Sequence, residues 1–126
     1  MKILIQISPG ELVDRTTILR LKSAHITDPL KRDLVRTELV RHEGLMGELP
    51  LDVVLGPLVD RLFSINARLW EIEDKIRACD RAQDFGPRFI QLAQDVYRTN
   101  AERFVTKREI DQLLGSSISE VKSYGD

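Results

Sequence analysis

The chain has 126 residues, 42% of them hydrophobic and 31% charged, a composition typical of one globular domain that needs no disulfide or metal to fold. Its formal net charge of −1 argues against nucleic-acid binding by bulk charge, which needs a concentrated positive surface. A single cysteine excludes an intrachain disulfide, and we find no signal peptide and no membrane-spanning apolar run. We therefore expect a cytoplasmic protein that does not bind membranes.

The first expected element is a short β-strand over residues 1–7, which are rich in isoleucine and alternate weakly. A strand needs a partner for its backbone groups. The only other strand-like run is residues 53–55, so the partner is either that run or a second copy of the chain.

Four helices are expected next, over residues 9–26, 29–46, 57–82 and 87–114, followed by a tail over 116–126. Ser8-Pro9 and Asp28-Pro29 each combine a capping side chain with proline at the first helical position, and Glu11 completes a capping box with Ser8. Gly115 is placed to cap the last helix. The sequence thus predicts one mainly α domain over residues 1–126, a helical bundle with one short strand.

The helix expected over residues 57–82 carries the strongest pattern in the chain. Its apolar residues alternate at spacings of four and three, which is a heptad seam: Leu58, Leu62, Ile65, Leu69, Ile72, Ile76 and Cys79. The short turn over residues 83–87 makes this helix and the next one antiparallel neighbours. We expect a long helical hairpin with the seam buried from Leu62 to Ile76 and both N-terminal helices packed on it.

A second stripe beside this seam predicts the one candidate ligand pocket. Folding the hairpin at residues 84–85 places Trp70 opposite Asn100 and Glu73 opposite Tyr97, and Arg77 lies one helical turn from Glu73. Two interpretations stay open for these five residues. Either they satisfy one another and fix the register of the helices, with Arg77 pairing Glu73, or they bind a ligand.

Carboxylates three residues apart occur twice, as Glu11 with Asp14 and as Glu71 with Asp74. Such pairs share a helix face and suit Mg²⁺, as in all-helical nucleotide pyrophosphohydrolases. The further acidic pair that those enzymes need is missing here. Capping explains Glu11, and surface salt bridges to Lys75 and Arg77 explain Glu71 and Asp74. The sequence therefore predicts no metal site and no cofactor.

The other reactive side chains are expected to be structural. Glu38 and His42 lie four residues apart and form a helix-surface pair, because a di-iron bundle needs further ligands that this chain lacks. Cys79 lies on the heptad seam, where a buried and unreactive thiol is expected.

Five strings together resemble a family of short bacterial proteins that is defined as a domain of unknown function. In chain order these strings are ISPGELVDR (7–15), LWEIEDKIR (69–77), VYRTNAER (96–103), KREIDQLLGS (107–116) and EVKSY (120–124). The resemblance covers almost the whole chain and implies a bacterial source, a compact helical fold and a link to envelope polysaccharide synthesis. It transfers no activity, cofactor or catalytic residue. Lys75 follows Asp74 where the family often has an acidic pair, which argues against a carboxylate-cluster mechanism.

Two functions from different classes remain. The first is a non-enzymatic binding or assembly module that forms a homodimer or binds a protein partner, as the heptad seam and the unpaired strand indicate. The alternative is a small metal-dependent hydrolase of the nucleotide pyrophosphohydrolase type, as the Glu-x-x-Asp pairs indicate.

Overall fold

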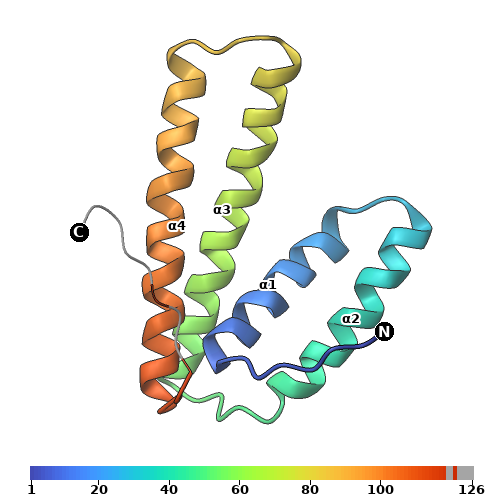
Figure 1. The fold of residues 1–126 in the computed structure, drawn as a ribbon, viewed down its shortest axis with the longest axis vertical. Coiled ribbons are helices and arrows are strands. Elements are labelled where there is room, and N and C mark those ends of the chain that lie inside the picture. The colour runs from blue at the N-terminus through green and yellow to red at the C-terminus, as the bar shows by residue number, and fades with distance from the viewer. Residues whose placement is uncertain (119–120, 122–126) are drawn as a thin grey trace.

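The computed structural model describes residues 1–118 and residue 121. In this part of the chain the helices are α1 (Pro9–His25), α2 (Pro29–Met46), α3 (Leu55–Arg81) and α4 (Pro87–Leu113), as Figure 1 shows. Each helix begins and ends within two residues of the bounds expected from the sequence. The fold is mainly α, as predicted, although most of the tail expected over residues 116–126 lies outside the described residues.

The β-strand expected over residues 1–7 is absent, since the described part of the chain contains no strand. We call residues 1–7 the N-terminal arm; no backbone–backbone hydrogen bond joins it to any other described residue. The run proposed as its partner within the chain, residues 53–55, instead leads into the first turn of α3. The side chain of Asp52 accepts hydrogen bonds from the backbone N–H groups of Val54 and Leu55, at 2.9 and 2.8 Å, and so holds the turn that leads into α3.

The helix ends follow the capping residues of the sequence. Ser8 Oγ accepts a hydrogen bond from the backbone N–H of Glu11 at 3.1 Å, which confirms half of the predicted capping box. The Glu11 carboxylate instead binds Arg15 and Lys107. Beyond α4, Gly115 has a φ of 64°, the left-handed conformation expected of a glycine cap.

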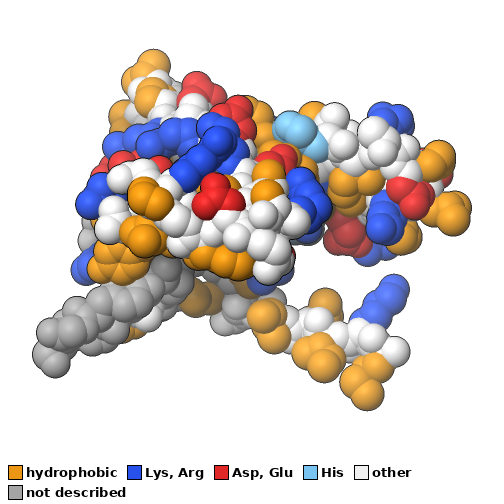
Figure 2. Space-filling view, turned by 90° about the horizontal axis from the view of Figure 1, so that it is seen from above, with side chains coloured by type: hydrophobic (Ala, Val, Ile, Leu, Met, Phe, Trp, Pro, Cys, Tyr) orange, Lys and Arg blue, Asp and Glu red, His pale blue; other side chains and the backbone are white. Residues whose placement is uncertain are grey.

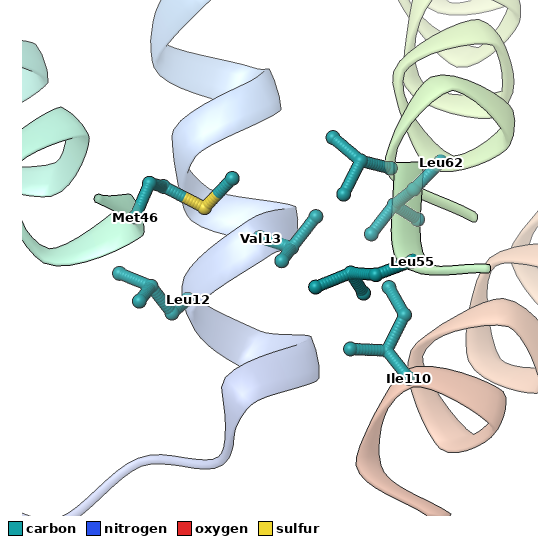
Figure 3. Packing of buried hydrophobic residues seen from close by; sticks show 7 residues of the cluster. Leu12, Val13, Met46, Leu55, Leu62 and Ile110 are labelled. Atoms are coloured by element: carbon teal, nitrogen blue, oxygen red, sulfur yellow. The ribbon is translucent and has the colours of Figure 1, made fainter. Parts of the chain in front are cut away.

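The hydrophobic core lies where the first turns of α1 and α3 meet the last turns of α4 and α2 (Figure 3). Its buried residues are Leu12, Val13, Met46, Leu55, Val59, Leu62 and Ile110. Ile7, at the end of the arm, packs against this cluster and is half-buried. The core therefore joins the start of α1 and the end of α2 to the end of the hairpin where α3 begins and α4 ends.

The heptad seam of α3 is buried over only part of its length. Leu62, Ile65 and Leu69 are buried as predicted, whereas Ile72 and Ile76 are half-buried. Figure 1 gives the reason: α1 lies along the lower half of the α3–α4 hairpin, and the upper half extends beyond it as two helices alone. Cys79, nearer the end of α3, is nevertheless buried, as predicted.

The two N-terminal helices differ in how they pack. The backbone of α1 lies close to α2, α3 and α4, whereas the backbone of α2 lies close to that of α1 alone. The expectation that both helices pack on the hairpin is therefore correct for α1 and wrong for α2, because Met46 is the only buried residue that α2 contributes. Several large apolar side chains of α2 stay exposed: Leu30, Leu34, Val40 and Leu45. None of the helices, over their described residues, is long and apolar enough to cross a membrane.

Candidate functional site

The stripe predicted to bind a ligand lies at the surface of the hairpin. Glu73, Arg77 and Tyr97 are exposed, and Trp70 and Asn100 are half-buried. The helical phase placed all five on inward-leaning positions, which is wrong for the three exposed ones because α1 does not reach that far along the hairpin. Ligand binding by these residues stays a prediction.

Two contacts of the stripe differ from the expected ones. Arg77 Nη2 donates to Asp74 Oδ1 at 2.5 Å, one turn back on the solvent side of α3, where Glu73 was the expected partner. The Trp70 ring stacks on the His25 ring, with the ring centroids 4.7 Å apart. Trp70 thus holds the end of α1 against α3.

The buried polar site is centred on Asp14, whose side chain is 1% exposed. Arg103 Nε donates to Asp14 Oδ1 at 2.8 Å and Arg103 Nη2 donates to Oδ2 at 2.5 Å, which is a two-pronged ion pair. Asn66 Nδ2 donates to Asp14 Oδ1 at 2.9 Å and to Thr17 Oγ1 at 2.8 Å. One carboxylate on α1 therefore binds side chains from both α3 and α4.

A second ion pair lies beside the first. Lys107 Nζ is 2.6 Å from Glu11 Oε2 and 3.7 Å from Asp14 Oδ2. Burial raises the pKa of Glu11, but hydrogen bonds from Lys107 and Arg15 outweigh it and hold the pKa below its ordinary value. We call Glu11, Asp14, Asn66, Arg103 and Lys107 the Asp14 cluster. Its two carboxylates balance its two cations.

The first turn of α1 lies against α4 beside this cluster. The backbone N–H of Gly10 donates to Asp111 Oδ1 at 2.7 Å, so a carboxylate of the chain itself occupies this helix N-terminus. A Cβ atom added to Gly10 would clash with the backbone carbonyl of Lys107. Glycine is needed here because the two backbones approach closely.

The Asp14 cluster is closed rather than open to a ligand. Among the described residues, every buried side-chain nitrogen and oxygen has a hydrogen-bond partner. The cluster therefore fixes α1 on the hairpin. The sequence carried a signal for it: Asp14 lies on the buried face of α1 between Val13 and Thr17, and an acid there requires a cation.

An exposed series of ion pairs joins α3 to α4. Arg61 Nη2 is 2.5 Å from Glu109 Oε2, and Arg68 pairs with Glu102. In both pairs the residue numbers add to the same total as in the predicted pairing of Trp70 with Asn100, so the predicted register of the hairpin is confirmed. We call these two pairs the charged ladder. A seven-residue spacing on each helix was the signal that the sequence offered.

The surface between the two ion pairs of the charged ladder carries a hollow. A hollow of about 440 Å³ has Ile65, Ala101 and Val105 in its lining and the four ladder residues at its rims. A second hollow, of about 370 Å³, adjoins it along the hairpin. Neither gathers metal ligands, and no group of three or more His, Cys, Asp or Glu side chains in the described chain is placed to hold a metal ion.

The N-terminal arm carries a run of exposed aliphatic side chains. Ile3 is 78% exposed, Leu4 96% and Ile5 72%. In Figure 2 the arm lies apart from the helices, at the lower right, with hydrophobic side chains along its length. Three adjacent aliphatic residues in water are unfavourable for a protein that stays alone, so the arm is the most conspicuous candidate for a binding surface.

Comparison of the chain with models of protein families, with curated proteins and with solved structures found no match. The candidate site therefore rests on geometry alone: a closed polar cluster, an exposed charged ladder and an exposed aliphatic arm.

Proposed function

We propose that the protein is a non-enzymatic assembly module that works as a homodimer. The observation that carries this proposal is the N-terminal arm, with Ile3, Leu4 and Ile5 exposed and no backbone hydrogen bond to other described residues. Exposed aliphatic side chains on such a segment lose contact with water when another chain covers them, which favours association.

The outer side of α2 supports the same proposal. Leu30 and Leu34 are 77% and 71% exposed, and the backbone of α2 lies close to that of α1 alone. Exposed aliphatic side chains therefore occur on two separate elements of the N-terminal half. Large exposed apolar side chains of this kind favour protein–protein contacts over catalytic sites.

The hydrolase alternative lacks comparable support. Of the two Glu-x-x-Asp pairs, Glu11 and Asp14 bind Lys107 and Arg103, and Asp74 binds Arg77. A carboxylate that is neutralised by an adjacent cation is a poor ligand for Mg²⁺. In this proposal the protein works in the bacterial cytoplasm, where the single cysteine stays reduced, and it binds no nucleic acid. The link to envelope polysaccharide synthesis rests on the family resemblance.

The proposal is tested by measuring the mass of the full chain by light scattering over a range of concentrations. We expect a dimer, and we expect Ile3→Lys/Ile5→Lys to be monomeric. Burying one isoleucine contributes about 1.5–3 kcal/mol, and a tenfold change in affinity needs about 1.4 kcal/mol. Because a symmetric dimer buries each residue twice, the double variant should weaken association by more than about a hundredfold.

The control is Ile90→Lys on α4, which introduces one of the two added charges at a 55% exposed isoleucine far from the arm. It should keep the mass of the unmodified chain. A chain that is monomeric at every concentration would contradict the proposal, and so would an arm variant that stays dimeric.

A further inference from the structure

We infer that one face of the α3–α4 hairpin, the face with the charged ladder, docks a second copy of the chain about a two-fold axis parallel to the two helices. Figure 1 shows α3 and α4 side by side along the hairpin, so together they offer one elongated face. The inference goes beyond the proposed homodimer, because it concerns α3 and α4 and does not depend on the N-terminal arm.

The hollow in this face has the form that receives a side chain from a facing helix. In knobs-into-holes packing, four residues of one helix at spacings of three, one and three surround each inserted side chain. The α3 residues that line the hollow have these spacings: Arg61, Ser64, Ile65 and Arg68.

Val105 on α4 is the side chain that fits this hole. It lines the same hollow, is 51% exposed, and lies midway between Glu102 and Glu109. Because these two glutamates pair with Arg68 and Arg61, Val105 is at the height of the middle of the hole on α3. A two-fold axis parallel to the helices places the partner's α4 over α3 at an unchanged height. The partner's Val105 therefore points into the hole and covers its apolar floor.

The charges beside the hollow are complementary in the same arrangement. It brings the partner's Glu109 to Arg61 and the partner's Glu102 to Arg68. The pairs within each chain can persist, since a guanidinium has five N–H donors. A two-fold axis across the helices would instead place α3 over α3 and bring Arg61 to the partner's Arg68, a like-charge contact. The charge pattern therefore selects the axis parallel to the helices.

The adjoining hollow extends the same pattern. It is lined by Glu71 and Lys75 on α3 and by Asp95 and Arg98 on α4. Continuing the register of the charged ladder by seven residues places Lys75 at the height of the partner's Asp95, and Glu71 within one residue of the partner's Arg98. Four successive charges on α3 thus face charges of opposite sign on the partner's α4.

The size of the face predicts a weak contact. From Arg61 to Lys75 it is about 21 Å long, and two helices are roughly 20 Å wide, which gives on the order of 400 Å² per copy. A standard interface buries about 800 Å² per partner. We therefore expect docking through this face at higher concentration than association through the arms, and a face in contact with water in dilute solution.

Sedimentation equilibrium over a wide concentration range tests the docking surface. The measurement uses the full chain with Ile3→Lys/Ile5→Lys, so that the arm does not contribute to the mass. This arm variant should be monomeric where the unmodified chain is a dimer, and should form dimers through the hairpin face at higher concentration. At that higher concentration the unmodified chain should exceed the mass of a dimer.

Two charge variants of the arm variant separate contacts between chains from contacts within one chain. Arg61→Glu/Arg68→Glu makes both sides of the hollow acidic, and Glu102→Arg/Glu109→Arg makes both sides basic. Each alone should associate at least about tenfold more weakly than the arm variant, because like charges then meet. An equimolar mixture of the two should recover the association. The pairs within each chain are broken in both variants, so recovery in the mixture reports contacts between chains.

Cysteine cross-linking of the arm variant tests the direction of the axis. With the axis parallel to the helices, Ser64→Cys faces the partner's α4 at position 105, and helices packed 8–10 Å apart bring such thiols within reach of a disulfide. A mixture of Ser64→Cys chains with Val105→Cys chains should therefore form disulfides faster than either alone. An axis across the helices would bring Ser64→Cys beside its own symmetry mate. The chain with no added cysteine is the control, because Cys79 is buried.

The outcomes separate the inference from the proposed function. An arm variant that stays monomeric up to about 1 mM overturns the inference and leaves the proposed homodimer standing. A mixture of the charge variants that associates no better than its components also overturns it, and so does faster linking of Ser64→Cys alone. A dimer that Ile3→Lys/Ile5→Lys keeps and Arg61→Glu/Arg68→Glu loses supports the inference and overturns the arm as the dimer surface. An unmodified chain that is monomeric at every concentration overturns both.

Discussion

Arginine–carboxylate pairs join helices in two regions of this molecule, and the two regions differ in burial. In the Asp14 cluster the Asp14 side chain is 1% exposed and Arg103 is 30% exposed. In the charged ladder the Arg68 and Glu102 side chains are both 53% exposed. The same chemical groups therefore meet in two environments within one short chain.

The comparison teaches that the environment, and not the number of ion pairs, decides how much a pair matters. Removing one partner of a buried pair leaves a desolvated charge and costs about 3–5 kcal/mol, whereas exposed pairs contribute about 0–1 kcal/mol. The Asp14 cluster should therefore control whether α1 stays docked, and the charged ladder should fine-tune a hairpin that Leu62, Ile65 and Leu69 already hold together.

The largest expected effect is that of Asp14→Ala. This substitution removes the carboxylate that Arg103 and Asn66 both bind. We expect the free energy of unfolding, measured by urea denaturation, to fall by roughly 3 kcal/mol, the low end of the range for buried pairs because Arg103 is partly exposed.

The control for Asp14→Ala removes both charges at once. Asp14→Leu/Arg103→Met replaces the pair with apolar side chains and should recover much of the loss, since neither charge of the pair is left alone and Lys107 keeps Glu11 as its partner. A loss below about 1 kcal/mol for Asp14→Ala would place the pair among exposed ones and remove the contrast between the two regions.

The next effect is that of Gly10→Ala, which tests the close approach of α1 to α4. The added Cβ meets the Lys107 backbone carbonyl, which cannot move without shifting α4. We expect a loss of about 1–3 kcal/mol in the free energy of unfolding, as for other overpacked positions. Gly44→Ala on α2 is the matched control, because its Cβ meets nothing within 4 Å, and it should stabilise by about 0.5–1 kcal/mol. Equal effects at both glycines would contradict the close approach.

The sequence predicted the elements of this fold better than their partners. Helix starts follow from Ser8-Pro9 and Asp28-Pro29, because capping is a local interaction. The register of the hairpin follows from the length of its turn, and the ladder pairs agree with it. Capping and short turns depend on residues that are close in the sequence, so the sequence alone can predict them.

Long-range packing was less accessible. Asn66 lies one helical turn before Trp70 on α3, yet its side chain binds Asp14 and Thr17 on α1. The heptad seam alone does not say where α1 stops, and that end point leaves Glu73 and Tyr97 exposed. Which helix covers which face depends on many weak contacts between helices. The periodicity of one helix therefore does not predict it.

The smallest expected effect is that of Arg68→Ala in the charged ladder. It breaks the pair with Glu102, and both side chains are already half in water, so the free energy of unfolding should fall by less than about 1 kcal/mol. The coupling energy from a double-mutant cycle with Glu102→Ala isolates the pair from the loss of the arginine stem over the hollow. This coupling should shrink in about 1 M salt, where the screening length is only about 3 Å. The change caused by Asp14→Ala should persist in the same salt, because its carboxylate is shielded from ions. A coupling energy between Arg68 and Glu102 above about 2 kcal/mol that persists in salt would contradict this prediction. The exposed pair would then behave as a buried one, which would need another chain to cover that face.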